Sequence, residues 1–385
     1  MNQTGQGRSA ALSIPNWKDG LTMNHYASIA AALEAENLDA VLLTGEANRF
    51  YASGFFTPGT DATLLVTRKD AVFLTDARYT EAAGRRLDGA ELREVKPGRG
   101  LTDQLRELVF LKGIRRLGFE DAAMSVQSFR RLEKALSEEG RPPCELAAAS
   151  EPLLKLRQTK DAGELAAMEA AQGIAERALE DILKEIRPGV TEREIAARLQ
   201  YLMLHYGASD MSFDPIVVSG PNGSLPHGVP SEKEIRSGEF VTMDFGCIYG
   251  GYCSDMTRTV AVGSATEEMR RVYQTVLAAQ AAGIAAAGAG VPGKAVDAAA
   301  RAVIREAGWG EYFTHSFGHG VGVEIHEAPN AAASNEVPLP AGAVISAEPG
   351  IYIPGKLGVR IEDVILITPE GRRNLTKAPK DLLIL

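Results

Sequence analysis

Acidic residues that interrupt apolar, strand-like segments constrain how the C-terminal part of this chain can fold. Asp244 stands in Val-Thr-Met-Asp-Phe and Glu348 stands in Ile-Ser-Ala-Glu-Pro, among residues typical of buried strands. Asp and Glu are disfavoured in strands, and a buried charge is costly unless another group compensates it. Whatever fold the chain adopts must therefore bring a compensating partner to each of these carboxylates.

Three more residues on or beside predicted strands belong with these two acids. Asp255 lies in Cys-Ser-Asp-Met, Glu362 lies in Arg-Ile-Glu-Asp, and His319 stands between two glycines. Arg258 and Arg360 could neutralise one or two of the four acids, but not comfortably all of them. Four neighbouring carboxylates repel one another and raise one another's pKa, whereas two divalent cations would balance their charge. The predicted ligand set is Asp244, Asp255, His319, Glu348 and Glu362.

The chemistry of this set limits which metals it suits. Four carboxylates and one imidazole form a fairly hard ligand set, which fits Mn²⁺, Co²⁺, Fe²⁺ or Zn²⁺ better than a metal that prefers thiolate. Carboxylates can bridge two such ions, and the pair lowers the pKa of a bridging water so that hydroxide is available near neutral pH. We expect two divalent ions per chain, with Mn²⁺ preferred.

The chain divides by its pattern of predicted elements. Its 385 residues exceed one ordinary core, so two domains are expected. Residues 1–22 are polar and glycine-rich, and we interpret them as a flexible arm. Residues 23–153 alternate predicted strands with helices, which indicates an α/β domain with a partly parallel sheet. In residues 154–385 helices come first and β-hairpins later, which is typical of an α+β domain with a mainly antiparallel sheet.

Local signals place several elements of the second domain. Apolar spacing predicts a long helix over residues 164–186 that stops at Pro188-Gly189. Thr191 and Glu194 fit a capping box at the start of the next helix, which runs to about Tyr206. Strands are predicted over residues 213–218, 240–246, 251–262, 343–348, 350–353 and 359–367.

Composition argues against several classes of partner and location. A net charge of -9 disfavours nucleic acid and anionic membranes, both of which need a basic face. Three cysteines are too few for a disulfide framework and fit a reducing compartment. The first residues contain no apolar run typical of a secretory signal, and no segment is apolar enough to span a bilayer. We therefore expect a cytoplasmic protein.

The order of the five predicted ligands resembles that of the pita-bread metallopeptidases, which include methionine aminopeptidase, prolidase, aminopeptidase P and the metal-free creatinase. The family's Asp, Asp, His, Glu and Glu ligands have a counterpart here in each case. Segments 226–228, 323–327 and 350–352 are similar to the proline-specific branch, and segments 48–55 and 75–79 to its N-terminal domain. The resemblance covers nearly the whole chain. It implies a creatinase-like N-terminal domain and a catalytic domain with a curved sheet.

The resemblance also implies roles for individual residues. Glu348 would accept a proton from the attacking water and pass it to the leaving nitrogen. His227 and His326 would donate hydrogen bonds to the substrate or the developing oxyanion. One departure from the family pattern is Ser346-Ala347 before Glu348, where Thr and a larger aliphatic residue are more usual.

Four further residues complete the predicted site. Arg360 is two residues from Glu362, hence on the same face of the predicted strand, and could orient the metal-binding carboxylates. Tyr352 could add a polar contact, and Phe213 could form part of the wall that receives a proline ring. His315 would lie near the substrate, although a buried structural role is its principal alternative.

The activity that the resemblance implies is hydrolysis of the Xaa-Pro bond in a peptide or dipeptide with proline in second position. A dipeptidase (prolidase) is preferred, and an aminopeptidase P acting on longer peptides is the alternative. A creatinase-like hydrolase and a non-catalytic binding protein of the same fold are disfavoured because the ligand set is complete. The resemblance further implies a homodimer.

Overall fold

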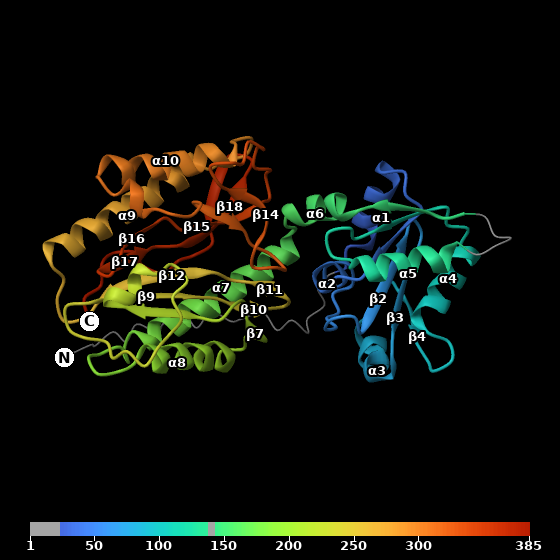
Figure 1. Cartoon of the computed structure of the whole chain (residues 1–385), viewed down its shortest axis with the longest axis horizontal. Coiled ribbons are helices and arrows are strands. Elements are labelled where there is room, and N and C mark those ends of the chain that lie inside the picture. Colours follow the sequence, from blue (N-terminus) through green and yellow to red (C-terminus); the bar gives the residue numbers. More distant parts are fainter. Residues whose placement is uncertain (1–23, 138–142) are drawn as a thin grey trace, which may run out of the picture.

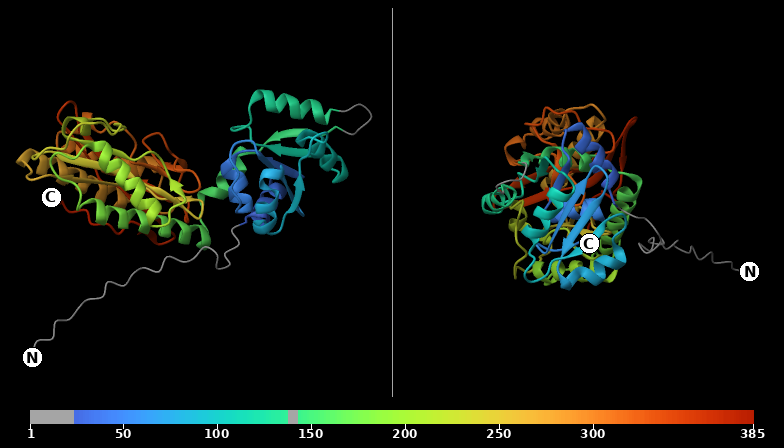
Figure 2. Two further views of the ribbon diagram at one scale, coloured as in Figure 1. Left: turned by 90° about the horizontal axis from the view of Figure 1, so that it is seen from below. Right: turned by 90° about the vertical axis from the view of Figure 1, so that its right-hand side faces the viewer.

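Two lobes joined by helix α6 (Ser150–Gln158) make up residues 24–137 and 143–385, which the computed structural model describes (Figure 1). A view from below shows the same two bodies following each other along the long axis (Figure 2). The predicted arm, residues 1–22, lies outside the described residues. Helix α6 runs across the expected boundary between residues 153 and 154, and the domain limits stay a prediction.

The N-terminal lobe is built around one mixed sheet. Its strands are β1 (Ala40–Leu43), β2 (Ala62–Thr67), β3 (Ala71–Thr75), β4 (Glu91–Glu94), β5 (Arg116–Phe119) and β6 (Glu145–Ala148). Their order is β4-β3-β2-β1-β5-β6, with parallel pairs β3–β4, β1–β5 and β5–β6. Strands β1, β2 and β3 are buried along their whole length, which is why they read as continuous apolar runs. The predicted α/β lobe with a partly parallel sheet is confirmed.

In the part of the chain that the structure describes, five helices accompany this sheet. They are α1 (Tyr26–Ala35), α2 (Glu46–Ser53), α3 (Ala77–Arg86), α4 (Leu101–Leu111) and α5 (Val126–Leu136). Two separate apolar clusters lie on the sheet: one includes Ile29 of α1 and Val41, and the other includes Leu105 of α4 and Leu42. Because Val41 and Leu42 are neighbours on β1, their side chains point to opposite faces, so helices cover both faces of the sheet.

The C-terminal lobe is mainly antiparallel, as predicted. Its helices are α7 (Ala162–Ile182), α8 (Glu192–His205), α9 (Glu267–Ala286) and α10 (Gly293–Glu306). Its strands are β7 (Asp210–Met211), β8 (Ile216–Ser219), β9 (Phe240–Phe245), β10 (Cys247–Tyr249), β11 (Tyr252–Cys253), β12 (Met256–Ala261), β13 (Gly318–Gly320), β14 (Glu327–Ala331), β15 (Val344–Ala347), β16 (Gly350–Ile353), β17 (Leu357–Arg360), β18 (Asp363–Thr368) and β19 (Gly371–Asn374). Each ladder between these named strands is antiparallel.

The strands of this lobe lie between two pairs of helices. In Figure 1 α9 and α10 lie above the strands and α7 and α8 below them. One buried cluster packs α9 and α10 against β15 to β18, and a second packs α7 and α8 against β9 and β12. The capping box predicted at Thr191 and Glu194 begins α8. In the described part of the chain, no helix combines the length and apolar character that crossing a membrane requires.

Three predicted strands differ from the structure. The segment 213–218 becomes strand only from Ile216, and the segment 251–262 is interrupted between β11 and β12. The segment 359–367 divides into β17, which pairs with β16, and β18, which pairs with β15. The chain therefore changes sheets at residues 361–362. Arg360 ends β17 and Glu362 lies outside both strands, so the two residues do not share one strand as predicted, although both line one cavity.

Glycine permits a close contact between the lobes. Gly251, in the turn between β10 and β11, has φ +82°, and a Cβ built there would lie 1.9 Å from the Phe50 ring of α2. That ring meets Tyr252 edge-on, with ring centroids 6.1 Å apart. Phe50 and Tyr252 belong to one buried cluster, so the N-terminal lobe packs directly on the hairpin that leads to Asp255.

Gly251→Ala is expected to lower the thermal unfolding midpoint more than Gly355→Ala. Gly355 also turns a hairpin with positive φ, +66°, but no atom of the described residues lies within 4 Å of a Cβ built there. Left-handed backbone alone costs a non-glycine residue about 1–2 kcal/mol. The clash with Phe50 should add about 1–3 kcal/mol of overpacking to the Gly251 variant. Equal midpoints for the two variants in calorimetry would contradict this account of the lobe contact.

Candidate active site

The five predicted ligands converge on one cavity in the C-terminal lobe. Asp244 lies within β9 and His319 within β13, whereas Asp255, Glu348 and Glu362 lie where strands end or break. His319 Nε2 is 3.5 Å from Asp255 Oδ2 and 3.2 Å from Glu348 Oε1. Donor atoms of Asp255, His319 and Glu362 all lie within 4.8 Å of one another. The fold thus gathers residues spread over more than a hundred positions of sequence.

The His319 ring is oriented by its own backbone surroundings. Its Nδ1 lies 3.1 Å from the carbonyl oxygen of Gly320, and an N–H donated there leaves Nε2 to face the carboxylates. A hydrogen bond of this kind to the far ring nitrogen is typical of metal-binding histidines. The backbone N–H of His319 donates to Ser346 Oγ, which donates in turn to Glu348 Oε1. Ser346, the departure from the family pattern, therefore links two predicted ligands.

The glycines beside His319 allow strands to approach closely. A Cβ on Gly318 would lie 2.0 Å from the Ser346 carbonyl oxygen, and one on Gly320 would lie 2.4 Å from the Glu327 carbonyl oxygen. Any larger residue at either position would separate β13 from a neighbouring strand. The alternating glycines are thus required by packing around the site.

The unpartnered oxygens of the buried carboxylates test whether the site fits metal. Within the described residues, Asp244 Oδ1, Asp255 Oδ1 and Glu362 Oε1 are buried and have no hydrogen-bond partner. The second oxygen of two of these groups is held: Asp244 Oδ2 by Arg360 and Glu362 Oε2 by Thr257. Buried carboxylate oxygens without donors are costly, and divalent cations would satisfy them. The residues therefore fit a divalent-metal centre.

The pKa values of these carboxylates also reflect repulsion between like charges. Burial, together with the neighbouring carboxylates, raises the pKa of Asp255 and of Glu362 well above the usual range. Burial also raises the pKa of Asp244, although Arg360 opposes this effect. Burial opposes ionisation of Glu348 too, but its contact with His319 prevails and lowers the Glu348 pKa to about 2. Burial disfavours the His319 cation, yet Glu348 raises the His319 pKa to about 9. The His319 ring thus lies beside Asp255 and Glu348, and the Arg360 guanidinium lies beside Asp244.

Arg360 is a buried cross-link of the site. Its guanidinium donates to Asp244 Oδ2 at 2.5 Å, to the Tyr352 hydroxyl at 2.8 Å and to the Pro226 carbonyl at 3.2 Å. The Tyr352 hydroxyl also lies 2.8 Å from His315 Nε2. Tyr352 is therefore buried behind Arg360, whereas His315 lies between Tyr352 and the cavity.

The cavity has a volume of about 1100 Å³ and brings the remaining predicted residues together. His227, His315, His326 and Phe213 line it together with the five predicted ligands. The His319 and His326 rings meet edge-to-face with centroids 4.2 Å apart. The structure thus gathers every predicted site residue except Tyr352 around one space.

Sequence reasoning missed an ionic cluster next to His326. Buried Arg157 of α6 donates to Glu324 at 2.7 Å and Glu327 at 2.5 Å, and Lys160 Nζ donates to Glu327 at 2.5 Å. Arg157 Nη1 also donates to Asn48 Oδ1 of the N-terminal lobe at 3.0 Å. Nothing in the polar sequence around Arg157 distinguishes it from an exposed helix residue. The contact ties the segment that carries His326 to both lobes.

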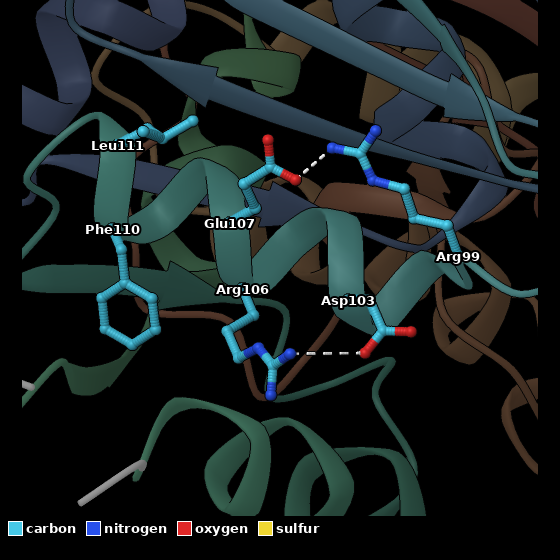
Figure 3. A pocket seen from close by; sticks show the side chains of 6 residues that line it. All are labelled: Arg99, Asp103, Arg106, Glu107, Phe110 and Leu111. Carbon is cyan, nitrogen blue, oxygen red and sulfur yellow. Dashed lines mark hydrogen bonds and ion pairs between the residues drawn. The ribbon is translucent and has the colours of Figure 1, made fainter.

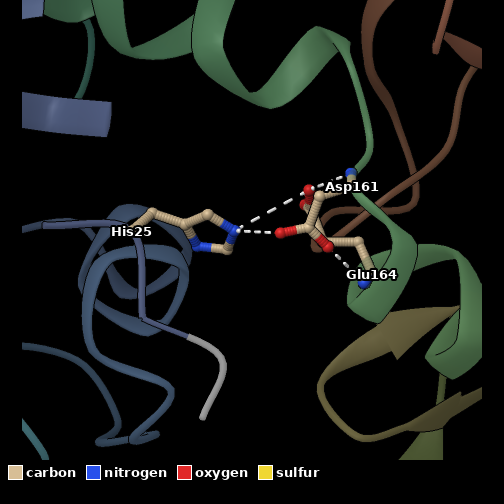
Figure 4. Close-up of side chains that lie close together, drawn as sticks. All are labelled: His25, Asp161 and Glu164. Atoms are coloured by element: carbon tan, nitrogen blue, oxygen red, sulfur yellow. Dashed lines mark hydrogen bonds and ion pairs between the residues drawn. The ribbon is translucent and has the colours of Figure 1, made fainter. Parts of the chain in front are cut away.

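A second histidine–carboxylate cluster lies between the lobes (Figure 4). His25 Nε2 is 3.3 Å from Asp161 Oδ2 and 3.8 Å from Glu164 Oε2. The other oxygens are also occupied, because Asp161 Oδ1 accepts the Glu164 N–H, and Glu164 accepts the Asp161 N–H and the Tyr252 hydroxyl. Since each carboxylate oxygen has a donor, this cluster is a hydrogen-bonded junction and differs from the cluster at His319.

A surface depression on α4 is unlike the active-site cavity (Figure 3). Its charged residues pair with one another, Arg99 with Glu107 and Arg106 with Asp103. Leu111 at its edge is largely exposed. Since each of these four charged side chains has a partner, the described residues that line the depression offer no free acid or base.

Comparison with known families identifies the lobes. The model of the Metallopeptidase family M24 matches residues 166–369, which include all five predicted ligands. The chain belongs to this family. The Creatinase/Prolidase N-terminal domain matches residues 26–159. The M24 assignment confirms the predicted family and fold, makes the chain a peptidase, and implies divalent metal.

Individual relatives align with nearly the whole length of this chain. An Xaa-Pro dipeptidase of Pyrococcus horikoshii is 37% identical over 91% of this chain and 96% of its own length. The structure of an Xaa-Pro dipeptidase from Bacillus anthracis is 42% identical, with a TM-score of 0.86, covering 94% of this chain and 99% of the other. An X-Pro aminopeptidase from Thermotoga maritima is 37% identical, with a TM-score of 0.86, covering 92% and 100%.

Removing metal is expected to destabilise the protein, because the cations offset repulsion among buried carboxylates. Metal at 100 times its Kd should stabilise the fold by about 2.7 kcal/mol. Asp255→Ala and Glu348→Ala should each reduce bound metal, measured by elemental analysis, and abolish peptide hydrolysis.

His326→Ala is the matched control, since it removes a cavity residue that is not a predicted ligand. Its metal content should stay near that of the unchanged protein while its turnover falls. Full activity in either carboxylate variant, or loss of metal from His326→Ala, would overturn the ligand assignment.

Proposed function

We propose that this chain is a metal-dependent Xaa-Pro peptidase, preferably an Xaa-Pro dipeptidase, that hydrolyses the bond before proline. The observation that carries the proposal is the cavity beside His319, where buried carboxylates keep oxygens for which the described residues supply no hydrogen-bond partner. Relatives named Xaa-Pro dipeptidase, 37% identical over 91% of the chain, support the choice of substrate.

Two divalent ions, with Mn²⁺ preferred, are proposed to bind Asp244, Asp255, His319, Glu348 and Glu362. When bound, such a pair supplies Lewis acidity and lowers the pKa of water. Arg360 holds Asp244 in place through their hydrogen bond. Glu348, which accepts a hydrogen bond from Ser346 and lies 3.2 Å from His319, is proposed to accept a proton from the attacking water. It would pass that proton to the leaving proline nitrogen.

The imidazoles that line the cavity beside the predicted ligands are proposed to bind the substrate. His227 and His326 both line the space beside the predicted ligands, and either can donate to an oxyanion as it develops. Phe213 is proposed to contact the proline ring, and His315, fixed by Tyr352, to support the wall of the site.

Hydrolysis of longer peptides is the second candidate function, and the residues that line the cavity support it. A dipeptide places a carboxylate next to its proline, which requires a positive group or a closed wall. Arg360 is the one Arg or Lys among the described residues that line the cavity, and it donates to Asp244, Tyr352 and Pro226. The structure of the Thermotoga maritima X-Pro aminopeptidase matches this chain with the same TM-score, 0.86, as that of the Bacillus anthracis Xaa-Pro dipeptidase.

Two properties of the protein as a whole are part of the proposal. We propose a homodimer, as the family resemblance implies, which could bring a group from the second subunit to the open end of the cavity. We also propose a cytoplasmic location, supported by three cysteines that are all free.

Hydrolysis of Ala-Pro and Ala-Pro-Ala should be compared with Mn²⁺, Co²⁺ and Zn²⁺, and with a chelator as control. We expect Ala-Pro to be cleaved in the presence of metal and not in the presence of chelator. Release of Ala from the tripeptide would establish the aminopeptidase alternative. Cleavage of neither peptide by metal-loaded protein would reject both forms of the proposal.

A further inference from the structure

Glu192 is a fully buried carboxylate that holds the two ends of one active-site segment. It occupies the first turn of α8, and it is 0% exposed. The segment 219–231 leaves β8, passes through His227, and returns beside Glu192. The donors to Glu192 come from Ser219 at one end, Asn222 within, and Ser231 at the other.

Each oxygen of Glu192 accepts both a backbone and a hydroxyl hydrogen bond. Oε1 accepts the Ser219 N–H at 2.7 Å and its hydroxyl at 2.9 Å. Oε2 accepts the Ser231 N–H at 3.2 Å and its hydroxyl at 2.6 Å. The Asn222 side-chain amide lies 3.1 Å from both oxygens. A carboxylate accepts on both sides, and the helix N-terminus favours its charge, so this position requires Glu.

The opposite side of the segment rests on β17. Gly223 and Gly358 meet backbone to backbone, and a Cβ on Gly358 would lie 1.7 Å from the Gly223 carbonyl oxygen. The Pro226 carbonyl accepts a hydrogen bond from Arg360, which ends β17. The segment is therefore held between α8 and the strand whose last residue binds Asp244.

His227 has no comparable support of its own. Its side chain is exposed in the cavity and makes no hydrogen bond within the described residues. The ring position consequently depends on the backbone of the segment, and that backbone is anchored through Glu192.

We infer that Glu192 is a positioning residue that acts on the reaction through His227. The inference rests on the proposed function of the site, in which His227 contacts the substrate. In this inference, a buried residue that does not line the cavity determines where a substrate-binding side chain lies.

Glu192→Gln tests this inference in a double-mutant cycle with His227→Ala. Glutamine cannot substitute, because its NH₂ group would face a backbone N–H on either side. For Ala-Pro, we expect kcat/KM to fall about 100-fold in His227→Ala, a loss typical of an oxyanion donor. Glu192→Gln should cost about 10-fold alone and less than about 2-fold in the His227→Ala background, since coupled residues are not additive.

Glu194→Gln is the matched control. It makes the same change in the same helix turn, but Glu194 bonds only Thr191 within the described chain. It should leave kcat/KM within about 2-fold, as expected for a surface change. If Glu192→Gln does not fold, Ser231→Ala removes one hydroxyl donor and should give a smaller loss with the same dependence on His227.

Hydrogen exchange supplies a readout that does not require activity. Amides of the segment 219–231 should exchange faster in Glu192→Gln and stay unchanged in Glu194→Gln, with bound metal equal in both. Unchanged exchange, or equal fractional losses of activity with and without His227, would overturn the inference. Full activity of His227→Ala would also overturn the inference, because His227 would then have no role in the reaction. No cleavage of Ala-Pro by the unchanged protein would instead reject the proposed function, while faster exchange would still show that Glu192 holds the segment.

Discussion

Repulsion among buried carboxylates is the constraint on which the C-terminal lobe depends. Asp244, Asp255 and Glu362 are buried with raised pKa values, and each keeps an oxygen for which the described residues offer no hydrogen-bond donor. Arg360 and His319 compensate part of this charge. Such a cluster is costly for the fold alone, so its presence in the core is explained by the cations it can bind.

The arrangement of strands follows from bringing these groups together. Asp255, Glu348 and Glu362 lie where strands end, and there the backbone can aim a side chain without the alternation of a regular strand. Gly318 and Gly320 let the neighbouring strands approach the histidine that lies between them. The packing of the core and the geometry of the site are thus two aspects of the same contacts.

Much of this organisation could be predicted from the sequence because acids in apolar segments are conspicuous. The same reasoning could not locate the strand breaks at Asp255 and Glu362, since strand-forming residues resume soon after each acid. Tyr352, expected to contact the substrate, lies behind Arg360. Glu192 and Arg157 occur in polar helical sequence, and only tertiary contacts reveal that both are buried.

The ionic contact between Arg157 and Glu327 has a consequence for how such a catalytic lobe can exist. The matched M24 region begins at residue 166, after both Arg157 and Lys160. A chain reduced to that region would leave the buried Glu327 carboxylate without its two cations, a loss of partner that typically costs about 3–5 kcal/mol. Glu327 directly follows His326, so the same truncation would release strand β14, which begins beside that cavity residue. The peptidase lobe is therefore not a separable module, because helix α6 and the residues just after it supply the two cations that neutralise Glu327.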